Sequence, residues 1–78
     1  MRADIVTQAV PGADPEFIQI LGRLPEPPAG VFEKLLKLLP KLHQIFLAKR
    51  SADRTGDEDE FARLMQKELD LVQKVTGV

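Results

Sequence analysis

The sequence has no cysteine, tyrosine, tryptophan or asparagine, and it has one histidine, His43, and one serine, Ser51. Without cysteine the chain forms neither a disulfide nor a thiolate metal site. A catalytic triad would have to be assembled from Ser51, His43 and a carboxylate, but Ser51 lies about two helical turns beyond His43. We therefore expect no catalytic residues and no enzymatic activity.

Motifs for phosphate and metal binding are also missing. The glycines are isolated from one another, so no glycine-rich phosphate loop is present. The acidic run DEDE is followed by Phe61 and Ala62, where a calcium loop needs an oxygen ligand and a glycine. Pro40 stands three residues before His43, where a di-iron bundle would place glutamate. We expect no metal and no cofactor.

Long apolar runs and targeting signals are absent. The leucine-rich stretch 31–46 is interrupted by charged residues, so it falls short of the roughly 20 apolar residues that span a bilayer. Residues 1–10 lack the basic flank, apolar region and small-residue cleavage site of a secretory signal. We therefore expect no transmembrane helix and a cytoplasmic location.

What the sequence does have is a large apolar share in a short chain. Of its 78 residues 44% are apolar, and the net charge is -1, which indicates a single folded domain. Domains of this size bury about 60% of the surface that the unfolded chain exposes, so their stability is marginal. Because no disulfide or metal adds to it, we expect a partner chain to do so.

Boundary signals divide the N-terminal third of the chain. Residues 1–13 carry little pattern and predict a loosely ordered arm. Asp14 is a good N-cap and Pro15 suits the first helical position, so an amphipathic helix is predicted at about 15–24. Residues 25–30 form a stiff proline-rich spacer.

Two longer helices are predicted at about 30–50 and 57–76. Pro40 removes one backbone hydrogen bond, and because the apolar stripe continues in phase we expect a kink rather than a break. Thr55 and Glu58 have the spacing of a capping box. The predicted fold is all-α: in one domain at 14–78, the short helix packs on a long antiparallel helical hairpin, which completes a helical bundle as a homodimer.

The middle helix carries more apolar surface than one neighbour covers. At 100° per residue its apolar arc spans roughly 200°. The predicted interaction face consists of Val31, Phe32, Leu35, Leu36, Leu38, Leu39, Leu42, Ile45 and Phe46. The short helix is only about two turns long, so a second copy of the chain is the expected cover. Another protein, a lipid surface, or a monomer wrapped around the short helix are the alternatives.

Two ionisable residues fall inside apolar arcs. His43 lies within the arc of the middle helix and Glu68 near the centre of the arc of the last helix. Antiparallel pairing brings them to within about one turn, so one hypothesis is a partly buried His43–Glu68 pair, within one chain or across a dimer. In the other hypothesis, the side chains of His43 and Glu68 separately reach the solvent-exposed edge of the apolar surface.

The leading functional hypothesis is a non-catalytic protein-interaction module, an oligomeric adaptor, regulator or assembly chaperone that acts through the interaction face. Its expected partner is itself, as a homodimer, or else another protein. The alternative is a binder of lipid or nucleic-acid surfaces through Lys34, Lys37 and Lys41, which line one helix face. The small net charge and the lack of aromatic residues between the lysines argue against nucleic acid.

Overall fold

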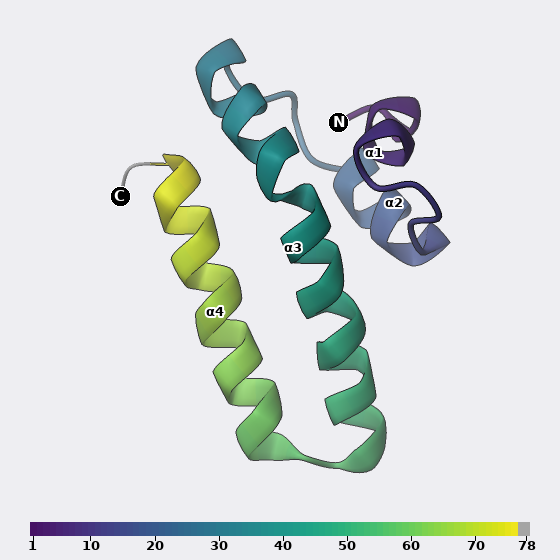
Figure 1. The fold of residues 1–78 in the computed structure, drawn as a ribbon, viewed down its shortest axis with the longest axis vertical. Helices are drawn as coiled ribbons and strands as arrows, with labels where there is room; N and C mark the ends of the chain where they lie inside the picture. The colour runs from purple at the N-terminus through teal and green to yellow at the C-terminus, as the bar shows by residue number, and fades with distance from the viewer. Residues whose placement is uncertain (77–78) are drawn as a thin grey trace.

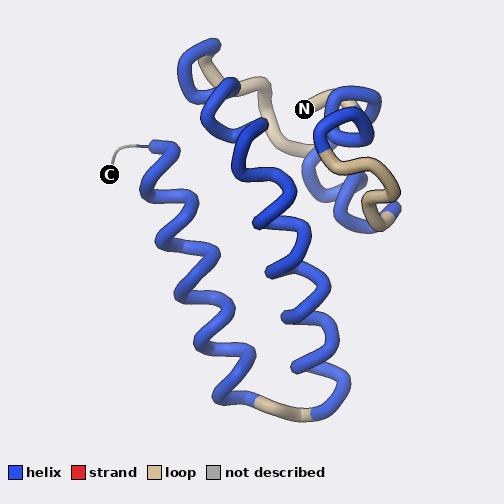
Figure 2. Tube along the Cα trace, viewed as in Figure 1, coloured by secondary structure: helices blue, strands red, loops and turns tan. Residues whose placement is uncertain are grey.

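A computed structural model describes residues 1–76, and within that range every regular element is an α-helix (Figures 1 and 2). The helices are α1 (Ala3–Ala9), α2 (Pro15–Gly22), α3 (Ala29–Thr55) and α4 (Glu58–Thr76). The predicted all-α class is confirmed. The predicted end of the domain, at residue 78, lies outside the described residues.

The long helix α3 runs through the middle of the molecule. Figure 1 shows α4 returning alongside α3 on one side, whereas α1 and α2 lie together on the other side, next to the N-terminal half of α3. In the part of the chain that the structure covers, no helix is both long and apolar enough to cross a membrane.

The N-terminal segment 1–13, expected to be a loose arm, is folded. Its helix α1 buries Val6 completely, and the Met1 side chain is also buried. The Met1 amino group donates hydrogen bonds to the carbonyl oxygens of Leu21, at 3.2 Å, and Leu24, at 2.8 Å. Because α1 is seven residues long and has no side-chain N-cap, it depends on this packing rather than on its own helix propensity.

Helix α2 begins where the sequence predicts. The Asp14 carboxylate accepts a hydrogen bond from the backbone N–H of Glu16, at 2.9 Å, and Pro15 follows as the first helical residue. The helix ends at Gly22, two residues early. Pro25 disfavours the helical conformation at Leu24, and the backbone N–H groups of Arg23 and Leu24 donate to carbonyl oxygens three residues back, those of Ile20 and Leu21.

Helix α3 continues through Pro40 as one helix and extends five residues past its predicted end. It stops at Gly56, whose φ of 74° lies in the left-handed region that glycine adopts without strain. Thr55 is the last residue of α3 and donates its hydroxyl to the carbonyl oxygens of Ser51 and Ala52. It therefore ends α3 and does not cap α4.

Asp57 takes the capping role instead. Its carboxylate accepts a hydrogen bond from the backbone N–H of Glu60, at 3.1 Å. The acidic residues in the first turn of α4 further stabilise this helix, because their negative charges lie at the positive end of the helix dipole.

The core lies where α1 and α2 meet the middle of α3. Its buried residues are Met1, Val6, Val10, Phe17, Leu21, Leu39 and Leu42. Leu39 of α3 and Val6 of α1 are the most completely enclosed side chains among them, each with 0% exposure. The N-terminal segment thus supplies part of the core on which the site described below is built.

Candidate functional site

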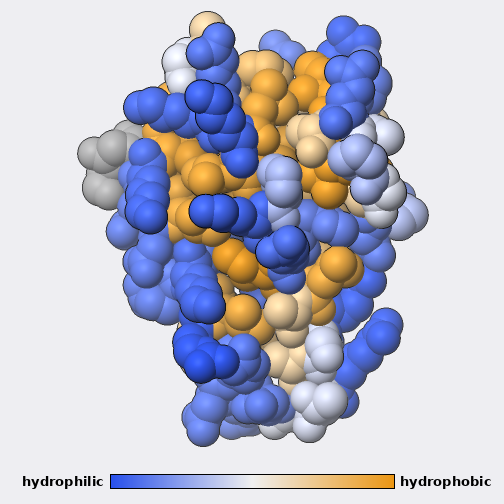
Figure 3. Space-filling view, in the orientation of Figure 1, coloured by the Kyte–Doolittle hydropathy of each residue, from blue (hydrophilic) through white to orange (hydrophobic). Residues whose placement is uncertain are grey.

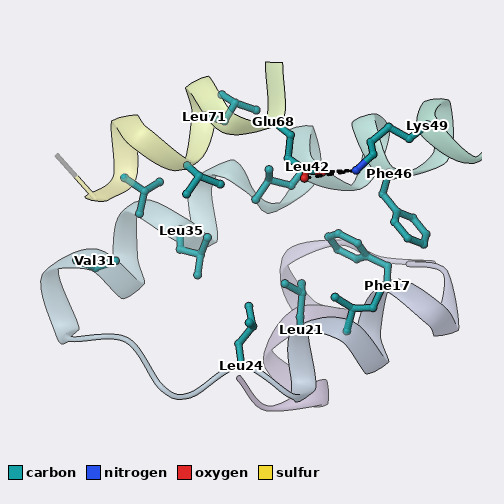
Figure 4. Close-up of a pocket in the computed structure, with 13 residues that line it drawn as sticks. Phe17, Leu21, Leu24, Val31, Leu35, Leu42, Phe46, Lys49, Glu68 and Leu71 are labelled. Carbon is teal, nitrogen blue, oxygen red and sulfur yellow. Dashed lines mark hydrogen bonds and ion pairs between the residues drawn. The ribbon is translucent and has the colours of Figure 1, made fainter. Parts of the chain in front are cut away.

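An apolar cleft of about 480 Å³ runs along α3 between α2 and α4 (Figure 4). The α3 residues that line it are Val31, Leu35, Leu42 and Phe46. The other apolar lining residues are Phe17, Ile20, Leu21 and Leu24 on the α2 side and Leu71, Val72 and Val75 on α4. Lys49 and Glu68 are the charged residues of its lining.

The cleft follows from the width of the apolar arc on α3. At 100° per residue, Ile45 lies on one flank of the arc, His43 on the other, and Leu35 and Leu42 between them. Ile45 borders α4 residues, whereas the His43 ring contacts Phe17 of α2 with ring centroids 5.0 Å apart. The neighbouring helices thus cover the two flanks, and the apolar α3 residues between them that line the cleft are Val31, Leu35, Leu42 and Phe46.

The predicted interaction face is only partly used within the chain. Of its nine residues, Leu39 and Leu42 are buried and the other seven are half-buried. Leu39 belongs to the core, while four of the nine, including Leu42, line the cleft. The surplus apolar surface that the sequence indicates is therefore present, as the cleft lining.

Large exposed apolar residues gather around the cleft. In residues 1–76, those exposed by 40% or more are Ile20, Leu24, Leu47, Met65, Leu69 and Val72. Three of these six line the cleft. Met65 and Leu69 lie on the same side of α4 as Val72, because residues three, four or seven apart share a helix face. Leu47 is not part of the cleft lining, so a substitution at Leu47 is a control for substitutions at exposed residues of the cleft region.

Lys49 and Glu68 form an ion pair in the lining of the cleft. The Lys49 Nζ lies 3.4 Å from Glu68 Oε2, and the side chains are 23% and 37% exposed. The Lys49 ammonium is also 5.5 Å from the centroid of the Phe61 ring. Glu68, which lies within an apolar arc, is thereby paired with a charge from α3 at the edge of the apolar surface.

His43 has a different partner, at the start of α2. Its Nε2 accepts a hydrogen bond from the backbone N–H of Asp14, at 3.1 Å. Within the chain, therefore, His43 and Glu68 each have a separate partner, and a His43–Glu68 pair across a dimer stays a prediction. Sequence reasoning missed the His43 contact because it depends on where the start of α2 lands on α3.

Arg50 of α3 holds the start of α2 electrostatically. Its guanidinium donates two hydrogen bonds to the Asp14 carboxylate, at 2.9 and 3.0 Å, and one to Glu16, at 3.0 Å. It also lies over the Phe46 ring, 4.7 Å from the centroid. Arg50 thereby ties the C-terminal half of α3 to the start of α2.

The Asp14–Arg50 pair predicts that the stability of the fold depends on pH in the acid range. The Arg50 hydrogen bonds lower the pKa of Asp14 from 3.8 to about 2. Because the folded pKa is the lower one, the pair stabilises the fold above the unfolded pKa, and this stabilisation is lost as the pH falls from 3.8 to about 2. Asp14→Asn, which keeps a good N-cap, should flatten the stability profile in this window.

Urea unfolding followed by far-UV circular dichroism, repeated from pH 2 to pH 5, measures that profile. Asp4→Asn is the matched control, because Asp4 is exposed and its one ion pair within residues 1–76 is with Arg2, two residues away. Profiles of the same slope for Asp14→Asn and the wild type would show that the Asp14–Arg50 pair does not stabilise the fold.

Lys34, Lys37 and Lys41 are exposed and, among the residues described, make no ion pair. Glu33 precedes Lys34 and lies four residues before Lys37, so the lysine face is not purely basic. Binding of lipid or nucleic acid through this face stays a prediction. The same region of the chain holds no group of three or more His, Asp or Glu placed to bind a metal ion.

Comparisons of the chain with protein-family models, curated proteins and solved structures gave no match. The function must therefore be inferred from the cleft and from the surface around it.

Proposed function

We propose that the protein is a small helical interaction module, without catalysis of its own, that binds a protein partner in the apolar cleft. The observation that carries this proposal is the cleft of about 480 Å³, whose rim holds the exposed residues Ile20, Leu24 and Val72. An exposed apolar patch next to a groove is typical of a protein-interaction site, and a groove between helices suits an amphipathic helix.

The first partner that we propose is a second copy of the chain. The pairing unit is the antiparallel hairpin of α3 and α4, kinked at Pro40. Ten apolar side chains are buried within residues 1–76, a small core for a chain with 44% apolar residues. Burial of the cleft against another copy would enlarge that core and stabilise a domain of marginal size. Such a homodimer suits an oligomeric adaptor, regulator or assembly chaperone.

Accessibility of the cleft to a soluble nitroxide tests this proposal. The nitroxide broadens NMR signals of exposed methyl groups, and we expect broadening at Val31, Leu35 and Val72 to decrease as the protein concentration rises. The methyl groups of Leu47, which is 40% exposed outside the cleft, should remain accessible throughout. Cleft methyl groups that stay equally accessible at every concentration would show that the cleft is not where copies meet.

A further inference from the structure

One side of α4 is uncharged and lies next to the cleft. Five charged residues follow the first turn, and one of them, Glu68, lies in the cleft lining and is paired with Lys49. At 100° per residue, the other four fall within an arc of about 60°. These four are Arg63, Lys67, Asp70 and Lys74. An arc of about 120° on the cleft side of the helix holds the uncharged flank. It consists of Ala62, Met65, Gln66, Leu69, Val72 and Gln73, all exposed.

The face of α4 turned away from the cleft has the opposite character. Figure 3 shows hydrophilic side chains along α4 on the face that Figure 1 presents. Lys67, Asp70 and Lys74 of α4 border Lys41 and Ile45 of α3 in a shallow depression outside the cleft. Apart from Glu68, which is paired with Lys49, the charges after the first turn of α4 thus lie on one side, although Leu69 and Met65 on the other side are 51% and 44% exposed.

The uncharged flank matches the cleft in chemistry. The lining charges of the cleft, Lys49 and Glu68, are already paired with each other, and the rest of the lining is apolar. The centre of a protein interface is likewise depleted of charge and enriched in residues such as methionine.

We propose that the occupant of the cleft is α4 of a second copy. The uncharged flank of each α4 enters the cleft of the other copy, between α2 and α4 of that copy. Because the two copies are related by a two-fold axis, the same contact fills both clefts. In this arrangement α3 and α4 of the two copies form a four-helix bundle, with α1 and α2 outside it. The inference rests on the proposed function and adds the element that enters the cleft.

Glutamate substitutions at two exposed leucines provide the first test. Leu69 of the uncharged flank is 51% exposed and Leu47 of α3 is 40% exposed. A single folded chain therefore tolerates a glutamate side chain at either position. We expect Leu69→Glu to weaken self-association at least about tenfold, because it places an unpaired charge in an apolar interface. Leu47→Glu should leave the association unchanged. Sedimentation equilibrium measures both, and far-UV circular dichroism confirms that each variant is folded.

Disulfide formation between two variants provides the second test. Because the chain has no cysteine, Leu69→Cys mixed with Leu24→Cys forms a mixed disulfide only between chains. We expect this disulfide under mild oxidation, since α4 of one copy would lie against the α2 side of the other cleft. A mixture of Leu47→Cys with Leu24→Cys is the control and should give much less.

The outcomes separate this inference from the proposed function. A wild-type dimer that is insensitive to Leu69→Glu and gives no Leu69–Leu24 disulfide would overturn the α4 docking, while self-association through another surface would stand. A chain that stays monomeric at all concentrations would overturn both the docking and the self-association. Weakening by Leu69→Glu together with the mixed disulfide would support the docking.

Discussion

Replacing Leu39 with alanine is expected to lower the free energy of unfolding by about 2–5 kcal/mol. Leu39 has 0% exposure and lies in the core where α1 and α2 meet α3. The truncation removes buried apolar surface and leaves a cavity that the surrounding helices fill only partly. Because a single core of this size supplies only about 3–5 kcal/mol, the variant should be close to unfolding at 25 °C.

Urea unfolding followed by far-UV circular dichroism measures this loss in a chain without tryptophan or tyrosine. Leu47→Ala is the matched control, since it makes the same truncation on the same helix at a side chain that is 40% exposed. It should change the free energy of unfolding by only about 0.5 kcal/mol. All chains must be compared at one protein concentration, because self-association adds to apparent stability. Equal losses at the two positions would contradict the position of the core.

Val6→Asp is expected to destabilise the fold by about 3 kcal/mol or more. The Val6 side chain is fully buried, and it belongs to the same core as Leu39 of α3. A carboxylate at this position would have to lose its hydration without a charged partner, or α1 would have to leave the core. Either response exposes apolar surface of α3, so the cost is measurable by urea unfolding.

Thr7→Asp controls for the effect of an added carboxylate on α1. Thr7 is adjacent to Val6 but exposed, so its replacement should cost no more than about 1 kcal/mol. If the N-terminal segment were the loose arm that its sequence indicates, both variants would unfold at the same urea concentration as the wild type.

The three longer helices were predictable because strong local signals mark them. Asp14 and Pro15 define the start of α2, and the periodic leucines define α3 through Pro40. The loop between α3 and α4 was placed less well. Thr55 was expected to cap α4, yet Gly56 in the left-handed conformation ends α3, and Asp57 caps the next helix. The spacing of Asp57 and Glu60 matches a capping box equally well, so the sequence contained this alternative signal.

Features that depend on tertiary contacts were not predictable from local pattern. Helix α1 is too short to be stable in isolation, so its existence follows from the burial of Val6. The partners of His43 and Arg50 are likewise set by where the start of α2 meets α3. In contrast, the surplus apolar arc of α3 was visible in the sequence, but the cleft required the positions of α2 and α4.

The solution mass of the wild-type chain decides whether a second copy covers the cleft. Sedimentation equilibrium with interference detection suits a protein that lacks tryptophan and tyrosine. We predict a mass of about twice the 8.7 kDa of one chain, falling toward one chain only on dilution. A mass of 8.7 kDa at every concentration would contradict the claim.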